Sequence, residues 1–332
     1  MFGRLFDITV VSPIGESTLL VDHTKGVDNF IVKGTISRFP YTEVDTLEIN
    51  IYNLAPRLLG QLYANHYFDG GLIYIDFGYK DTGPLQRIFA GNIQRAILSR
   101  PDAVTNCVTI YAFDCGDFVN YGFFGKTYED GYNMYAIAQD ILKENNVTNY
   151  QLSEKLKNFK SYGTQTYSGS ADKYLSNIAE QCGMYYKKEN MLLKMITPEE
   201  GSLEDVVYFT TKTDGKVTSM SGLIGIPRLT NDGLHFNCLI NPKLSIYGVC
   251  YIDNSIISIS QTEAIPSSVQ IGATLATNGM YRIVKMTTNF SNNDEENSMA
   301  IKALAKDFYD QYTVDQAAMR DEAKLNDKQN KY

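Results

Sequence analysis

Short runs of alternating hydrophobic and polar residues fill the first 120 positions, a pattern typical of half-buried strands. In residues 46–52 (TLEINIY), for example, Leu47, Ile49 and Ile51 fall on one face. Strands this closely spaced predict an antiparallel barrel or sandwich. The other elements predicted here are strands over Leu72–Tyr79, Gln86–Ala96 and Ala103–Phe113, a short helix over Pro56–Asn65, and a bulge or close backbone approach at Gly91.

Helical spacing replaces the alternation after about residue 116. Two one-sided helices are predicted, the first ending at Asn145 and the second running from its N-cap Ser170 to a stop at Gly183. Met184–Ile196 is predicted to form a hairpin that turns at Lys188–Asn190. Residues 116–215 are therefore predicted to be a small α+β unit. The apolar faces of the helices comprise Met134, Ile137, Ala138, Ile141 and Leu142, and Tyr174, Leu175, Ile178, Ala179 and Cys182.

The strand pattern returns from about residue 216, and no internal repeat is visible. Residues 313–332 carry mixed charges and almost no apolar stripe, which indicates a frayed helix or a disordered tail unless a partner orders it. Together the patterns predict a β-rich α+β fold. The strands predicted in this part are Leu234–Leu239, Ser245–Ile252, Ile256–Ser260 and Met280–Thr287. Ser298–Ala305 fits either a last strand or a helix, and a strand is favoured.

Composition narrows the class of protein. A chain of 332 residues suggests two or three domains, and its odd, scattered set of five cysteines indicates a reducing compartment. No apolar run is long enough for a membrane-spanning segment, and the N-terminus has no signal-peptide pattern. We therefore expect a soluble, non-secreted chain. A net charge of −8 argues against tight nucleic-acid binding, and the 24 tyrosines suit either strands or protein interfaces.

No pattern of catalytic or metal-binding residues stands out. The chain lacks both glycine-rich phosphate-binding motifs and the nucleophile-elbow motif. His235 and Cys238 are three residues apart in a predicted strand, so they point to opposite faces and do not form a metal site. The carboxylate pairs Glu43 with Asp45 and Asp114 with Asp117 are interpreted as solvated edges or loops rather than as a glycosidase pair. No cofactor, metal or catalytic residue is predicted, although a triad assembled from distant residues stays open.

Three segments together carry a family resemblance. They are Leu47–Ile93 with EINIYNLAPRLLGQL and IDFGYKDTGPLQRIFAGNI, Gly225–Asp253 with GIPRLTNDGLHFNCLINPKLSIYGVCYID, and Gly279–Asp294 with GMYRIVKMTTNFSNND. In this order and spacing the chain resembles the baseplate hub proteins of tailed bacteriophages, which are related to the base of the type VI secretion spike. The resemblance covers about residues 5–305 and consists of strand and turn signatures rather than a catalytic code.

The resemblance implies a doubled architecture. Hub proteins of this family are trimers whose subunits each carry two similar barrel-like domains, so six domains form a ring. Here residues 1–115 and 216–312 would be the two antiparallel barrel-like domains, 116–215 an inserted α+β domain and 313–332 a polar C-terminal tail. Such a ring satisfies both a sixfold tail tube and a threefold spike.

The resemblance also implies a structural, non-enzymatic role. The expected partners are two further copies in a homotrimer, a spike protein, the tail tube or its distal initiator, and other baseplate proteins, with DNA only in transit. The expected location is the virion tail tip, after assembly in the host cytoplasm. Tyr309 and Tyr312 are predicted anchors for a partner. The alternatives are a tail-associated enzyme that degrades cell walls, and a tyrosine-rich receptor- or carbohydrate-binding module.

Overall fold

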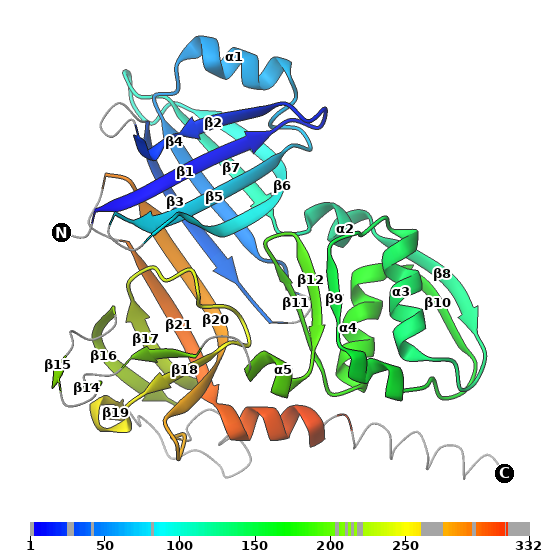
Figure 1. Cartoon of the computed structure of the whole chain (residues 1–332). Helices are drawn as coiled ribbons and strands as arrows, with labels where there is room; N and C mark the ends of the chain where they lie inside the picture. Colours follow the sequence, from blue (N-terminus) through cyan, green and yellow to red (C-terminus); the bar gives the residue numbers. More distant parts are fainter. Residues whose placement is uncertain are drawn as a thin grey trace.

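A computed structural model describes residues 3–24, 30–40, 43–80, 83–202, 206–209, 212–213, 216–217, 222–259, 275–293, 297–315 and 317. Most strands join one 14-stranded sheet, and a smaller unit of helices and short strands lies at its side (Figure 1). The predicted β-rich α+β fold class is confirmed. No helix in the described part of the chain is both long and apolar enough to cross a membrane.

The N-terminal half of the sheet uses seven antiparallel strands in the order β3-β4-β7-β6-β5-β1-β2. The predictions for β4 and β5 are confirmed residue for residue. The strand predicted from Ala103 begins only at Cys107, because Asp102 accepts the backbone N–H groups of Val104 and Thr105 and forms a turn there. The elements are β1 Arg4–Val11, β2 Ser17–Val21, β3 Ile31–Arg38, β4 Thr46–Tyr52, α1 Pro56–Ala64, β5 Leu72–Tyr79, β6 Gln86–Ser99 and β7 Cys107–Phe113.

The C-terminal half continues the same sheet. Strand β20 pairs along Met286–Ser291 with Lys33–Arg38 of β3, and this ladder joins the two halves. The prediction for β21 is confirmed, whereas the strand predicted from Ser245 begins at Val249, because Ser245–Gly248 forms a turn. The elements are β13 Val207–Phe209, β14 Lys212–Thr213, β15 Lys216–Val217, β16 Leu223–Thr230, β17 Gly233–Cys238, β18 Val249–Ile252, η3 Asn254–Ile256, β19 Ser258–Ile259, β20 Met280–Ser291 and β21 Ser298–Ala305.

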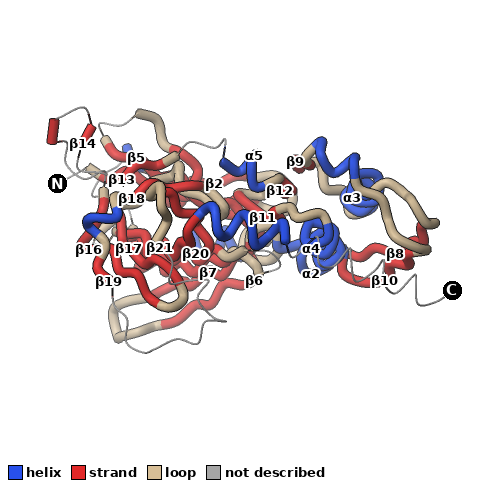
Figure 2. Tube along the Cα trace, turned by 90° about the horizontal axis from the view of Figure 1, so that it is seen from below, coloured by secondary structure: helices blue, strands red, loops and turns tan. Residues whose placement is uncertain are grey.

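The side unit supplies most of the helices, which Figure 2 shows gathered at one end of the strand-rich body. Both predicted helices are confirmed: Asn133 caps α3, Ser170 caps α4, and Gly183 follows α4 with a positive φ. The hairpin turns at Asn190-Met191 instead of Lys188–Asn190. The elements are α2 Gly116–Tyr121, β8 Phe123–Tyr128, α3 Met134–Glu144, β9 Tyr150–Leu152, η2 Glu154–Asn158, β10 Gln165–Ser170, α4 Ala171–Gln181, β11 Tyr185–Glu189, β12 Leu192–Ile196 and α5 Pro198–Ser202.

Two hydrophobic cores hold the chain together. One is shared by both halves of the large sheet, and the other lies inside the side unit between Cys115 and Met195. Residues 306–315 form a final helix that follows β21 and runs beneath α5 in Figure 1. Of the predicted polar tail, residues 313–315 and 317 continue this helix, and Gln316 and residues 318–332 lie outside the described residues.

Candidate functional site

The two halves of the sheet repeat one connection pattern. The path β3-β4-β7-β6-β5-β1 in the N-terminal half corresponds to β16-β17-β21-β20-β18-β13 in the C-terminal half. Equivalent strands also follow one another in the same order along the chain. The N-terminal half runs from β1 to β7, and the C-terminal half runs from β13 to β21. The two equivalent strands that come first along the chain differ in direction: β1 runs antiparallel to its neighbour β5, whereas β13 runs parallel to its neighbour β18. The chain is thus duplicated in topology.

The duplication extends to the register of single residues. In the N-terminal half Ala112 of β7 pairs with both Leu47 and Ile93, and in the C-terminal half Ala303 of β21 pairs with both Leu234 and Ile283. A bulge follows Ile93 in β6 and Ile283 in β20. All six of these side chains are buried. Equivalent residues therefore fill equivalent core positions.

Hydrogen bonds repeat as well. The Ile93 N–H donates to the Gly71 carbonyl at 2.7 Å, and the Ile283 N–H donates to the Gly248 carbonyl at 3.0 Å. One residue earlier, Asn92 of β6 and Arg282 of β20 each hold a carboxylate on the helix that follows the last strand of their half. The Asn92 amide donates to Asp117 at 2.8 Å, and the Arg282 guanidinium donates to Asp310 at 2.7 Å.

The edges of the two halves are not equivalent. Residues Met286–Ser291 of β20 pair with β3. The corresponding residues of β6, Gln94–Ser99, pair only with β7 within the described part of the chain. We call it the β6 edge. It exposes Ile97 by 44% and Leu98 by 47%. Such an unpaired, apolar strand edge is a template for pairing with another chain.

A second incomplete edge belongs to β16, the counterpart of β3. We call Leu223–Thr230 the β16 edge. On its outer side only the two-residue strand β19 is present in the described part of the chain, running parallel to Arg228-Leu229. Ile224 is 41% and Ile226 69% exposed on this edge. These two edges are the candidate functional site.

A buried charged cluster fixes the side unit to the N-terminal half. The Arg38 guanidinium donates to the Ile88 carbonyl and to Asn190, and it lies 3.7 Å from Glu189 and 3.8 Å from Asp45. Burial raises the pKa of Asp45 to about 8. Although burial opposes it, Lys187, Arg38 and Lys194 lower the pKa of Glu189 to about 2. The cluster is a rigid polar joint between β3 and the turn of β11 and β12.

Two of the carboxylates interpreted as solvated are buried. Asp45 and Asp114 are 3% and 0% exposed, and Asp114 accepts the backbone N–H groups of Asn190 and Met191 at 2.6 and 2.7 Å. Burial raises the pKa of Asp114. The interpretation was wrong at these two positions, because the side unit covers them. Glu43 and Asp117 are exposed.

The two tyrosines predicted as anchors lie on the final helix with different surroundings. Tyr309 is buried and stacks on Tyr185, with ring centres 5.9 Å apart, while Tyr312 is 41% exposed. Tyr185 stacks in turn on Tyr247 at 4.2 Å and donates its hydroxyl to Asp310. Partner binding by Tyr309 and Tyr312 stays a prediction, and Tyr312 is the one that faces solvent.

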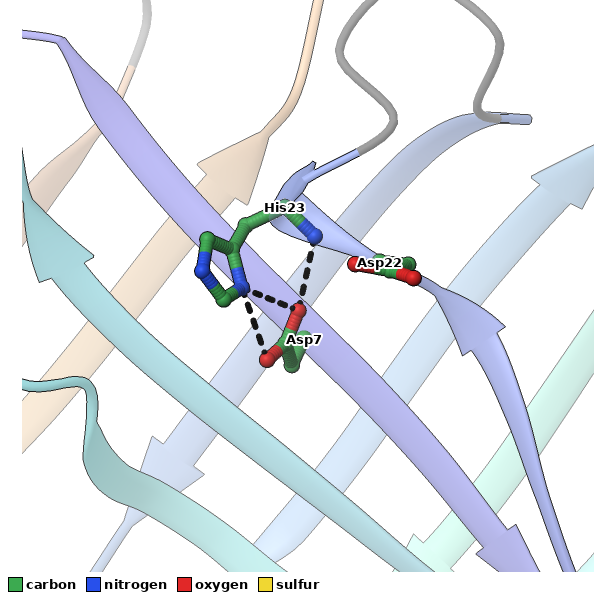
Figure 3. A group of neighbouring side chains, drawn as sticks. All are labelled: Asp7, Asp22 and His23. Carbon is green, nitrogen blue, oxygen red and sulfur yellow. Dashed lines mark hydrogen bonds and ion pairs between the residues drawn. The ribbon is translucent and has the colours of Figure 1, made fainter.

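One group of possible metal ligands lies at the start of the sheet. The His23 Nδ1 is 2.9 Å from both carboxylate oxygens of Asp7, and the His23 backbone N–H donates to the same carboxylate (Figure 3). Asp22 completes the group but accepts from the hydroxyl and backbone N–H of Thr24. A histidine–aspartate ion pair accounts for this geometry. His235 pairs with Asp232 at 2.9 Å, whereas Cys238 is buried in the core.

Comparison with known proteins gives matches in structure only. No protein-family model and no curated protein sequence matches the chain. The 43 kDa tail protein of prophage MuSo2 from Shewanella oneidensis matches with a TM-score of 0.57 and 9% identity, over 91% of this chain and 99% of its own. This chain has the fold of a prophage tail protein. The tail protein from Neisseria meningitidis MC58 matches with a TM-score of 0.55 and 8% identity, over 91% and 97% of the two chains.

A third match comes from a secretion system. The E. coli c3393 protein, a component of the type VI secretion system with structural similarity to the T4 tail proteins gp27 and gp5, matches with a TM-score of 0.51 and 10% identity. The match covers 83% of this chain and 74% of that one. At such low identity these matches establish the fold alone. They agree with the resemblance drawn from the sequence at the level of a tail-protein fold.

Proposed function

We propose that this chain is a structural hub of a phage tail that assembles as a homotrimer. The duplication of the sheet carries the proposal. Three subunits present six β halves, and a ring of six similar halves meets a sixfold tube on one side and a threefold spike on the other. The prophage tail-protein fold supports this role.

The unequal edges supply the contact between subunits. Inside the chain, β20 of one half pairs with β3 of the other. If the same contact recurs between chains, the β6 edge of one subunit pairs with the β16 edge of the next. The β20–β3 register can be transferred to β6 and β16 by aligning the two halves at Ala112 and Ala303. It then places Ile97 opposite Thr230 and Ser99 opposite Arg228. Because the two edges differ, the contact is head-to-tail, and its rotation is proposed to close the ring at three subunits.

The remaining parts of the proposal follow from the hub role. Residues 1–115 are one ring domain and 216–312, extended by β13 at Val207–Phe209, the other; the rest of 116–215 is an insert, and 313–332 binds another baseplate protein. The ring leaves a channel for DNA, and a net charge of −8 favours passage over binding. We propose no catalytic step, and we place the protein at the virion tail tip.

Charge substitutions on the two edges test the trimer. Ile97→Lys places an ammonium group in the proposed ladder, and Ile226→Lys places one on the same β16 edge two residues beyond the last proposed pair, so we expect both variants to contain less trimer than the wild type, Ile97→Lys the least. Ile14→Lys is the matched control, because Ile14 is 77% exposed in the turn between β1 and β2. Native mass spectrometry measures the result. A wild-type chain that stays monomeric at high concentration with its spike protein present contradicts the proposal.

A further inference from the structure

The β16 edge is already occupied where the neighbouring subunit is proposed to pair. Strand β19 lies parallel to it, with Ser258 beside Arg228 and Ile259 beside Leu229. The transferred register places Ile97–Ser99 of the neighbour against Arg228–Thr230. The two strands need the same backbone groups of β16, and one edge of a strand pairs with one partner at a time.

Strand β19 is held weakly. Its ladder spans only two residue pairs, and both of its side chains are exposed, with Ile259 at 55%. By contrast, β3 and β20 pair over six residues in the equivalent position. The anchor of β19 is the segment just before it, where Asp253 caps η3 and Ile256 and Ile257 pack against the large core. Strand β19 can therefore leave the edge without disturbing that anchor.

We propose that β19 is a replaceable strand. It covers the β16 edge in the free subunit, and the β6 edge of a second copy displaces it during assembly. This inference rests on the proposed trimer. A covered edge prevents open-ended pairing of free chains, a known hazard of unpaired strand edges. The exchange replaces a two-residue parallel ladder by a longer antiparallel one, so ring closure is favoured once three subunits meet.

A reversible crosslink tests the exchange. Paired residues in neighbouring strands lie close enough for a disulfide, so Arg228→Cys with Ser258→Cys locks β19 onto β16 when oxidised. All five native cysteines are buried free thiols and do not compete for the crosslink. We expect the oxidised variant to contain at least tenfold less trimer than the reduced variant, as measured by sedimentation velocity and native mass spectrometry. The two single-cysteine variants control for loss of the Arg228 and Ser258 side chains.

A matched lock elsewhere separates the outcomes. Thr9→Cys with Leu19→Cys joins β1 to the edge strand β2, away from both proposed contact edges, and we expect its oxidised form to assemble like the wild type. If the oxidised β19 lock forms trimers as well as its reduced form does, the exchange is overturned while the trimer stands. If the wild type and both reduced variants are monomers, the trimer itself fails and the exchange with it.

Discussion

The two halves of the large sheet share a register but place one equivalent acid in opposite environments. Asp45 precedes β4 and Asp232 precedes β17, each two residues before the leucine that pairs with the central alanine of its half. Asp45 is buried beneath the side unit, and burial raises its pKa to about 8. Asp232 is solvent-exposed; although desolvation opposes it, hydrogen bonds from Thr230, Lys302 and His235 lower its pKa.

The difference shows what the insertion changed. The side unit enters after β7 and packs at the start of β4, so the N-terminal half has a buried charged joint at the position where the C-terminal half has the exposed Asp232. The C-terminal half has the final helix after its last strand, where Arg282 holds Asp310. One fold thus carries two different attachments, and the predictions below separate what the halves share from what they do not.

The largest expected effect is at the equivalent residues Arg282 and Asn92. Arg282 is fully buried and donates to Tyr247, Pro198, Ser202 and Asp310, so Arg282→Ala removes four hydrogen bonds and leaves buried acceptors unpaired, although Tyr185 and Lys306 still contact Asp310. We expect a loss of about 3–5 kcal/mol in the free energy of unfolding. Asn92→Ala removes a hydrogen bond from an uncharged amide to a solvent-exposed carboxylate and should cost about 1–2 kcal/mol. Urea denaturation measures both, and equal losses would show that the two contacts are equivalent in strength.

The second comparison concerns the glycines that accept the repeated hydrogen bond. A Cβ at Gly71 would lie 2.2 Å from the Tyr67 carbonyl oxygen, whereas one at Gly248 would lie 3.0 Å from Ser245. We expect Gly71→Ala to cost about 3 kcal/mol or more and Gly248→Ala about 1 kcal/mol. Thermal unfolding of the two variants tests the order. A Gly248→Ala loss as large as that of Gly71→Ala would contradict it.

The third comparison uses pH. The folded state keeps a proton on Asp45 up to about pH 8, but the unfolded chain releases it near 3.8, so wild-type stability falls as pH rises through this window. The slope from this group is at most about 1.4 kcal/mol per pH unit. Asp45→Asn removes this titrating group and should therefore flatten the fall of the unfolding free energy with pH.

Asp232 contributes to the pH dependence of stability with the opposite sign, which Asp232→Asn tests. Its lowered pKa contributes stability above about pH 4 that is lost as pH falls, so this substitution should weaken the fold at neutral pH and leave it unchanged in acid. Urea midpoints from pH 2 to pH 8 measure both variants, because the Asp232 contribution is lost only below the unfolded pKa of 3.8. Parallel profiles for Asp45→Asn and Asp232→Asn would refute the assignment of opposite environments.

The smallest expected effect on stability is at Tyr312. Because its side chain is 41% exposed, Tyr312→Ala should change the free energy of unfolding by less than about 0.5 kcal/mol. If Tyr312 anchors a partner, the same change lowers affinity for the spike or another baseplate protein at least tenfold. Tyr63→Ala on α1, where Tyr63 is 43% exposed, is the control. Unchanged pull-down of every baseplate partner would remove Tyr312 from the proposal.

The local elements can be predicted from the sequence alone, because alternation and helical spacing depend on which face of an element is buried. β4, β5, α3, α4 and β21 follow from their own residues and caps. The early turn before Val249 and the shifted hairpin at Asn190-Met191 depend on contacts with distant residues, such as the Asp114 carboxylate.

The duplication, the buried acids and the two edges depend on tertiary contacts and are not visible in local sequence patterns. The halves share residue type at a few positions, such as Ala112 and Ala303, and match in burial alone at others, such as Ile73 and Cys250, while loops of different length shift the spacing of these positions along the chain. Asp45 is ordinary in sequence and becomes buried because distant residues pack over it, among them Asp114, whose backbone N–H donates to the Asp45 carbonyl, and Lys188. Whether Ile97 and Ile226 lie on open edges depends on which strands pair across the whole sheet, and a local pattern carries no such information.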